Sequence, residues 1–274
     1  MKIIHTTLTI VLLLVSCGKS DRPDTTVKAD ARNIVGEEVS YTADSVTMKG
    51  YLAYDANQKG KRPAVLVVHE WWGHNDYARK RATMLAEMGY IALAVDMYGD
   101  GKTADHPGDA GKFATAVMKN AAGAKERFLK AMETLLANPN ADAAKVAAIG
   151  YCFGGATVLN MARQGVDLKA VVSFHGSLAT ATPATKGSVK GRLLVCNGAA
   201  DTFVSEQDIA NFKKEMDAAG ATYTFKAYAD AIHGFTNPAA DSLGKKFGMA
   251  LAYNAKADEE SWNDMKALFK EVLK

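Results

Sequence analysis

Short apolar runs that alternate with stretches of helical periodicity constrain the fold of this 274-residue chain more than any other feature. Each run is too short for a helix and is rich in Val, Ile, Leu and Ala, which is typical of strands covered on both faces. The stretches between them are long enough for helices that connect parallel strands. The predicted strands are Pro63–Val68, Tyr90–Val95, Val146–Ile149, Ala170–Phe174, Leu193–Cys196 and Thr222–Tyr228.

The remaining segments complete an α/β architecture. Two further strands, Glu38–Thr42 and Ser45–Tyr54, are separated by a turn at Ala43-Asp44 and are expected to form a hairpin. The pattern predicts a mainly parallel sheet of about eight strands with helices on both faces, in one catalytic domain over residues 37–274. Helices are predicted over Asp76–Met88, Ala110–Ala137 (broken near Gly123), Gly155–Arg163, Glu206–Ala218 and Asp258–Leu273.

The first seventeen residues have the pattern of a bacterial lipoprotein signal. Met1-Lys2 supplies a small positive region, and an apolar run too short to span a bilayer ends in Leu14-Val15-Ser16-Cys17. We therefore expect residues 1–17 to be a signal peptide with a lipidated Cys17 at its end, and residues 18–36 to be a flexible tether. The protein would be exported, anchored by lipid to the bacterial cell envelope and facing the periplasm. The alternative is an ordinary signal peptide in which Cys17 is accidental.

Charge excludes some classes of partner. The net charge is only +3, and the longest basic run, Arg79-Lys80-Arg81, is shorter than one helical turn and is interpreted as a solvated helix face. We expect no nucleic-acid partner, and contact with a membrane only through the N-terminal lipid anchor. The class of partner that remains is a small molecule.

The segment Gly150-Tyr151-Cys152-Phe153-Gly154-Gly155 directly follows a predicted strand and opens a helix. This is the setting of a nucleophile elbow, with Cys in the place of Ser. A nucleophile on so tight a turn needs neighbours with little or no side chain, and the helix N-terminus favours a thiolate at Cys152. The backbone N–H of Phe153 is placed to stabilise an oxyanion. The glycines do not follow the dinucleotide-binding spacing.

Two residues later in the chain complete a candidate triad. Asp201 follows the strand Leu193–Cys196, and His233 follows the strand Thr222–Tyr228. Catalytic groups of doubly wound sheets collect at such strand ends, and the order nucleophile, acid, histidine is that of the elbow motif. We therefore expect a Cys152-His233-Asp201 triad.

The other histidines suggest no metal or cofactor. His69 and His74 are five residues apart rather than four, and Gly73 and the preceding buried strand disfavour the helix that a zinc motif needs. His175 ends a strand, where it either lines the substrate pocket or has a structural role. We expect neither a metal nor a cofactor.

Five motifs in order give the chain a resemblance to the dienelactone hydrolase family over about Val46 to Lys274. The resemblance implies an α/β-hydrolase fold and a carboxylic ester or lactone hydrolase, carboxymethylenebutenolidase-like, that works through an acyl-thioester. The motifs are His69-Glu70-Trp71-Trp72-Gly73, Asp96-Met97-Tyr98-Gly99, Gly150-Tyr151-Cys152-Phe153-Gly154-Gly155, Asp201-Thr202-Phe203-Val204 and His233-Gly234-Phe235.

The resemblance also implies roles for residues that spacing alone leaves unassigned. Glu70 would hydrogen-bond the Cys152 thiol until substrate arrives, and the N–H of Trp71 would be the second oxyanion donor. An apolar, aromatic entrance to the pocket is expected from Trp71, Trp72, Phe153 and Tyr98. In one respect the sequence departs from the family, because the arginines that clamp a substrate carboxylate are not matched: Asn237 occupies one position, and no arginine lies between Met97 and Lys125.

Two other functions remain open at this point. The chain could be a non-catalytic, lipid-anchored binding lipoprotein that keeps the hydrolase fold. It could also be a redox lipoprotein that cycles Cys152 with Cys196, although Cys196 is more typical of a small core residue.

Overall fold

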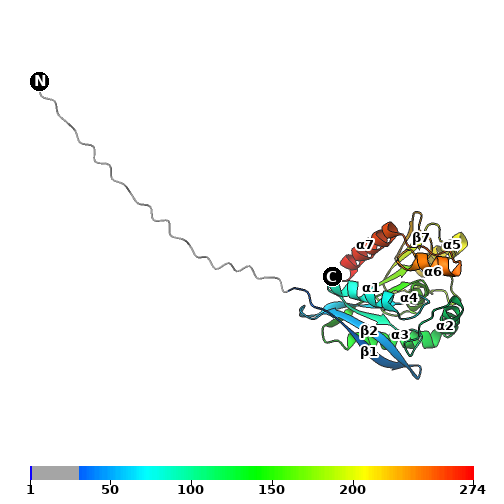
Figure 1. Ribbon diagram of the computed structural model, residues 1–274, viewed down its shortest axis with the longest axis horizontal. Helices are drawn as coiled ribbons and strands as arrows, with labels where there is room; N and C mark the ends of the chain where they lie inside the picture. The colour runs from blue at the N-terminus through cyan, green and yellow to red at the C-terminus, as the bar shows by residue number, and fades with distance from the viewer. Residues whose placement is uncertain (2–30) are drawn as a thin grey trace. The chain divides into compact units, whose positions relative to one another are not determined.

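The computed structural model describes Met1 and residues 31–274, and its strands form a single sheet in the order β1-β2-β4-β3-β5-β6-β7-β8 (Figure 1). The first two strands form an antiparallel hairpin, β2 pairs antiparallel with β4, and all other neighbours are parallel. The strands are β1 Ile34–Ala43, β2 Val46–Asp55, β3 Arg62–Val68, β4 Ile91–Val95, β5 Ala141–Tyr151, β6 Ala170–Phe174, β7 Arg192–Gly198 and β8 Tyr223–Tyr228.

Helices cover both faces of this sheet. Apolar side chains of α1 and α7 pack on one face, and those of α3, α4 and α5 pack on the other. This is the α/β-hydrolase arrangement that the sequence predicted. The helices are α1 Asp76–Glu87, α2 Pro107–Lys119, α3 Ala121–Leu136, α4 Phe153–Arg163, α5 Glu206–Ala219, α6 Ala240–Phe247 and α7 Ala255–Val272.

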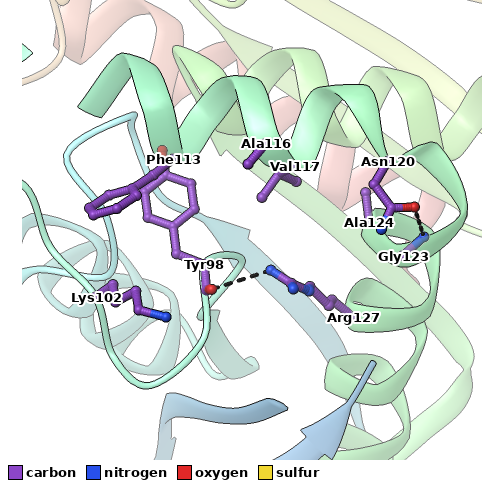
Figure 2. A pocket seen from close by; sticks show the side chains of 9 residues that line it. All are labelled: Tyr98, Lys102, Phe113, Ala116, Val117, Asn120, Gly123, Ala124 and Arg127. Carbon is purple, nitrogen blue, oxygen red and sulfur yellow. Dashed lines mark hydrogen bonds between the residues drawn. The ribbon is translucent and has the colours of Figure 1, made fainter. Parts of the chain in front are cut away.

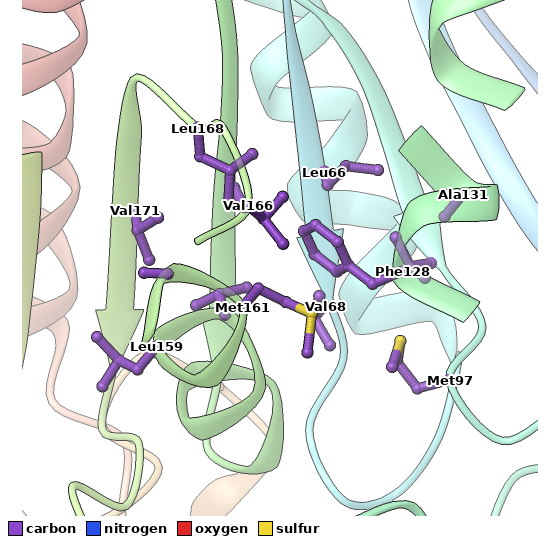
Figure 3. Close-up of a cluster of buried hydrophobic side chains, with 14 of the residues drawn as sticks. Leu66, Val68, Met97, Phe128, Ala131, Leu159, Met161, Val166, Leu168 and Val171 are labelled. Carbon is purple, nitrogen blue, oxygen red and sulfur yellow. The ribbon is translucent and has the colours of Figure 1, made fainter. Parts of the chain in front are cut away.

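The central strands supply the core to both layers. Along β3, Leu66 and Val68 belong to the cluster that includes α3 and α4, whereas Val65 and Val67 belong to the cluster beneath α1 and α7. All four are completely buried, as expected when successive side chains point to opposite faces of a doubly covered strand. Figure 3 shows the first cluster, in which Phe128 from α3 lies near the two β3 side chains.

Several boundaries differ from the sequence-based expectation. The hairpin turn lies at Asp44-Ser45, both with positive φ (52° and 57°), rather than at Ala43-Asp44. The break between α2 and α3 falls at Asn120, whose side chain accepts a hydrogen bond from the Gly123 N–H and so caps α3. The strand β1 begins at Ile34, inside the range expected for the tether.

The basic run on α1 is not a solvated face, which corrects the interpretation from the sequence. Arg81 is 4% exposed, and its guanidinium donates to the Asp258 carboxylate and to the Thr236 carbonyl, both at 2.6 Å. Arg79 on the same helix does lie near the surface, where it pairs with Glu38. Two basic residues of this run therefore have different environments, because Arg81 contacts Asp258 on α7 whereas Arg79 contacts Glu38 on β1.

The predicted signal peptide, Cys17 and most of the tether lie outside the described residues. Within the part that is described, no helix is both long enough and apolar enough to cross a lipid bilayer.

Candidate active site

Cys152 occupies the turn between β5 and α4, with φ 53° and ψ −113°. Its N–H donates to the Phe174 carbonyl on β6 at 2.9 Å, and its carbonyl accepts from the Ala156 N–H in the first turn of α4. A non-glycine residue in this region of backbone space is strained by about 1–3 kcal/mol, and the two hydrogen bonds hold it there. The thiol is thereby presented at the carboxyl edge of the sheet.

Two glycines make this turn possible because other backbone atoms lie where their Cβ atoms would be, and not because of unusual dihedral angles. A Cβ on Gly150 would overlap the carbonyl of Gly154, and a Cβ on Gly154 would overlap the carbonyl of Val68 on β3. The strand-turn-helix corner is thus packed directly against backbone, which explains the glycine spacing in the sequence.

The structure brings Cys152, His233 and Asp201 together. Nε2 of His233 lies 3.1 Å from the Cys152 Sγ, and Nδ1 lies 3.0 Å from Oδ2 of Asp201. The other carboxylate oxygen of Asp201 accepts the Phe203 N–H at 2.9 Å, which fixes the carboxylate in place. With a proton on Nδ1 shared with Asp201, the second ring nitrogen is directed at the sulfur.

The charge state of His233 follows from its neighbours. Burial alone would lower the pKa of this imidazole, but the Cys152 sulfur and the Asp201 carboxylate outweigh burial and raise its pKa to about 10. The Cys152 sulfur on one side and the Asp201 carboxylate on the other therefore stabilise an imidazolium at this position.

A cavity of about 300 Å³ opens over Cys152 and His233. Trp71 and Phe153 line it next to the sulfur, and Phe203 lines it on the His233 side, with the two rings 4.9 Å apart. Phe203 is 50% exposed and Met118, also in the lining, is 40% exposed. Apart from Met1, these are the large apolar side chains exposed in the described part of the chain, and both belong to this cavity.

The two expected oxyanion donors border the same cavity. Phe153 is the first residue of α4, so its N–H has no partner within the helix. Trp71 follows the end of β3, and among the described residues no acceptor is recorded for its N–H either. The carbonyl of Trp71 accepts a hydrogen bond from the hydroxyl of Tyr98 at 2.9 Å, which fixes the orientation of the peptide group between Trp71 and Trp72.

Glu70 does not contact the thiol, in contrast to the expectation from the family. Its carboxylate accepts a hydrogen bond from the Asn237 side-chain amide at 2.6 Å, while the recorded partner of the thiol is His233. Burial raises the pKa of Glu70 to about 7, although the bond from Asn237 and the charge of His233 oppose the rise. The Asn237 amide, in the loop that follows His233, thus supplies a hydrogen bond to the buried carboxylate of Glu70.

The three other residues expected in the pocket lie elsewhere, which corrects that prediction. Trp72 is buried against Ala104, Ala110 and Phe247, and Tyr98 lies behind Phe153. His175 is fully buried behind His233, with the two imidazole centroids 5.2 Å apart. None of the three is in the lining of the cavity that contains Cys152.

A polar network beneath the His233 loop was not foreseen from the sequence. The Thr236 hydroxyl lies 2.8 Å from Nε2 of His175 and 2.6 Å from the Tyr77 hydroxyl. Arg81 holds the carbonyl of the same threonine and packs against the Tyr151 ring, one residue before the nucleophile. No sequence motif marks this network, because its members come from α1, from β5, from the residue after β6 and from the loop between β8 and α6.

Cys196, the possible redox partner of Cys152, is a free, fully buried thiol that accepts a hydrogen bond from Tyr228. Burial raises its pKa to about 12. The described residues contain no group of three or more His, Cys, Asp or Glu side chains arranged to hold a metal ion.

Comparisons with known proteins agree with this geometry. The chain is 28% identical over 244 residues to protein usf of Aquifex pyrophilus, covering 87% of this chain and 100% of that protein. It is 27% identical over 245 residues to an Aquifex aeolicus protein provisionally named carboxymethylenebutenolidase, covering 88% and 100%. A solved dienelactone hydrolase-like promiscuous phosphotriesterase from metagenomic libraries superposes with a TM-score of 0.82 at 36% identity, over 88% of this chain and 99% of that one.

A model of the dienelactone hydrolase family matches residues 48–273, nearly the whole of the described domain. The relatives span the same domain from end to end, so the match is not confined to a shared motif. The chain belongs to the dienelactone hydrolase family and is a hydrolase of the kind that acts on ester and lactone bonds.

Proposed function

We propose that this hydrolase cleaves carboxylic esters or lactones through an acyl-thioester on Cys152, with His233 as the base and Asp201 as the residue that orients it. The observation that carries the proposal is the continuous contact from sulfur to imidazole to carboxylate, 3.1 and 3.0 Å long, at the floor of an open cavity. Such a nucleophile, base and orienter in sequence is the arrangement of covalent acyl transfer.

The steps follow from these positions. The Cys152 thiolate attacks the ester carbonyl, and the N–H groups of Phe153 and Trp71 stabilise the oxyanion. The C–O bond then breaks, the leaving alcohol takes its proton from His233, and the acyl group stays on sulfur. A water molecule that gives a proton to His233 next attacks the thioester, which releases the acid and returns Cys152 to the thiolate beside a protonated His233.

We assign Glu70 a positioning role rather than contact with the nucleophile. It is buried beside the site, bonded to Asn237, and electrostatically coupled to His233. A change in its protonation therefore acts on the base through charge.

The experiment compares the hydrolysis of 4-nitrophenyl butyrate by the wild type and by Cys152→Ala. We expect kcat/KM to fall by about 1000-fold or more, because removing the nucleophile of a triad leaves only the weaker contributions of binding and the oxyanion hole. Cys196→Ala removes a thiol of the same chain and should retain activity. Equal rates for the wild type and Cys152→Ala would sink the proposal, and would favour the alternative of a binding lipoprotein.

Phosphotriester hydrolysis is a second candidate. It is favoured by the 36% identity with the structure named a promiscuous phosphotriesterase, and by the apolar lining of the cavity, since a phosphotriester carries no charge. The same variants tested on diethyl 4-nitrophenyl phosphate decide it. Turnover that survives Cys152→Ala would place that reaction outside this site.

A further inference from the structure

The lining of the catalytic cavity is poor in polar groups. Of its twelve residues, nine are apolar, and the other three are Cys152, His233 and Ser177. Among the described residues that line this cavity, none is a lysine or an arginine. The single cation that can form there, His233, is already flanked by the thiol and by Asp201.

Cations do lie nearby, but in a second cavity that aromatic rings separate from the first. Figure 2 shows this cavity of about 340 Å³, with Lys102 and Arg127 at its wall. The Tyr98 ring lies between the two cavities: it packs on Phe153 at 5.4 Å on one side and on Phe113 at 5.5 Å on the other. Its hydroxyl is bonded to the Trp71 carbonyl, which holds the ring in this position.

The two cations are also occupied. Arg127 donates to the carbonyls of Met97 and Tyr98 and forms an ion pair with Asp44, and Lys102 pairs with Asp100. Neither side chain could bind an anion in the catalytic cavity without losing these partners and moving past Tyr98. A carboxylate that enters the catalytic cavity would therefore lose its hydration and contact only apolar side chains and the hydroxyl of Ser177. Such desolvation is costly for a charged group.

We propose that the catalytic cavity, with Met118 and Phe203 at its mouth, selects uncharged esters with apolar acyl and alcohol groups and discriminates against substrates that carry a carboxylate, because its lining offers no cation to pair with one. The inference rests on the proposed ester hydrolysis and adds the substrate class to it. It separates this chain from an enzyme that recognises its substrate by clamping an anion.

The test uses pairs of chromogenic esters that differ in charge but closely match in size. On the acyl side these are 4-nitrophenyl hexanoate and the mono-4-nitrophenyl ester of adipic acid. On the alcohol side they are the butyrates of methyl 5-hydroxy-2-nitrobenzoate and of the free acid. Each rate is divided by the uncatalysed rate of the same ester, which removes differences in intrinsic reactivity.

We expect kcat/KM for the neutral member to exceed that of the charged member by about 100-fold in at least one pair, since an unpaired carboxylate loses more than a few kcal/mol of solvation. Comparable values in both pairs, or a preference for the anion, would overturn the inference while leaving ester hydrolysis intact. Failure to hydrolyse any of the four esters would overturn the proposed function itself.

A substitution at the mouth tests the cause. In the ester pair that shows discrimination, Met118→Arg should reduce the ratio of kcat/KM for the neutral ester to kcat/KM for the charged ester by about tenfold. The reason is that arginine supplies the missing cation at a half-exposed position. The matched control Met118→Gln has nearly the same shape without charge and should leave the ratio within about twofold. The effect of arginine should shrink in 1 M salt, as expected for a partly exposed charge pair. A ratio that responds equally to arginine and glutamine would contradict a role for charge.

Discussion

At the scale of single residues, the buried Glu70 carboxylate accepts a hydrogen bond from the Asn237 amide at 2.6 Å. The grouping of Cys152, His233 and Asp201 was predictable because each lies in the turn or loop after a strand, and strand ends meet at one edge of the sheet. The partner of Glu70 was not, because Asn237 reaches it through a turn in which the Asn237 N–H bonds the Gly234 carbonyl. The sequence identified Asn237 only as a position without an arginine.

Glu70 should lower the stability of the fold at neutral pH. Its pKa rises from 4.5 to about 7 on folding because it is buried, so the native state binds more protons than the unfolded state between these values. The free energy of unfolding must then fall as pH rises through this window. The change in the free energy of unfolding caused by Glu70→Gln should therefore be more favourable at pH 8 than at pH 4, by on the order of 1–3 kcal/mol.

Urea unfolding at the two pH values measures this difference. The control is Glu133→Gln, an exposed glutamate paired with Lys130 on α3, which should change little with pH. A Glu70→Gln effect that is the same at pH 4 and pH 8 would show that the carboxyl is not held in its neutral form by burial.

At the scale of elements, Arg81 joins α1, α7 and the loop that carries His233. The basic run on α1 was expected to be solvated because its charge pattern resembles that of a surface helix. Arg81 is buried instead because it contacts Asp258 on α7, which lies 177 residues later in the chain. The Arg81 guanidinium lies over the rings of Tyr77, Tyr151 and Trp262 as well as against Asp258. The two helices and the loop therefore share one buried charge.

Arg81→Met should destabilise the domain by about 3 kcal/mol or more, because it leaves Asp258 half of a buried ion pair. Arg79→Met, two residues earlier on the same helix, breaks only the surface pair with Glu38 and should cost less than about 1 kcal/mol. Equilibrium unfolding in urea compares the two variants. A similar decrease in the free energy of unfolding for both variants would mean that the buried pair with Asp258 adds no more stability than the surface pair with Glu38.

At the scale of the whole molecule, periodicity predicted the eight strands and the helices on both faces, since each buried run is bounded by clear turn residues. It missed α6, Ala240–Phe247, because this short helix contains a glycine, two lysines and few apolar residues. Of the four aromatic residues expected at the pocket entrance, Trp71 and Phe153 line the cavity over Cys152, whereas Trp72 and Tyr98 do not. Aromatic residues near strand ends can point into the core as readily as into a cavity, and only the packing of α2 against Trp72 and Tyr98 decides which.

The N-terminal lipid anchor stays a prediction from sequence. If Cys17 is lipidated, the full chain expressed in a bacterial host should sediment with membranes, and its mass should exceed that of the processed polypeptide by the acyl groups. Cys17→Ser should abolish both properties, whereas Cys196→Ala should preserve them. A processed chain with an unmodified thiol at Cys17 would refute the anchor.

The corner that holds Cys152 is built against the carbonyl of Val68, a residue of β3, and the sulfur meets its imidazole only after the chain has added β6, β7 and β8. A partly synthesised chain that lacks those strands cannot form the contact between this sulfur and the imidazole of His233. The pairing of Cys152 with His233 is therefore coupled to completion of the sheet.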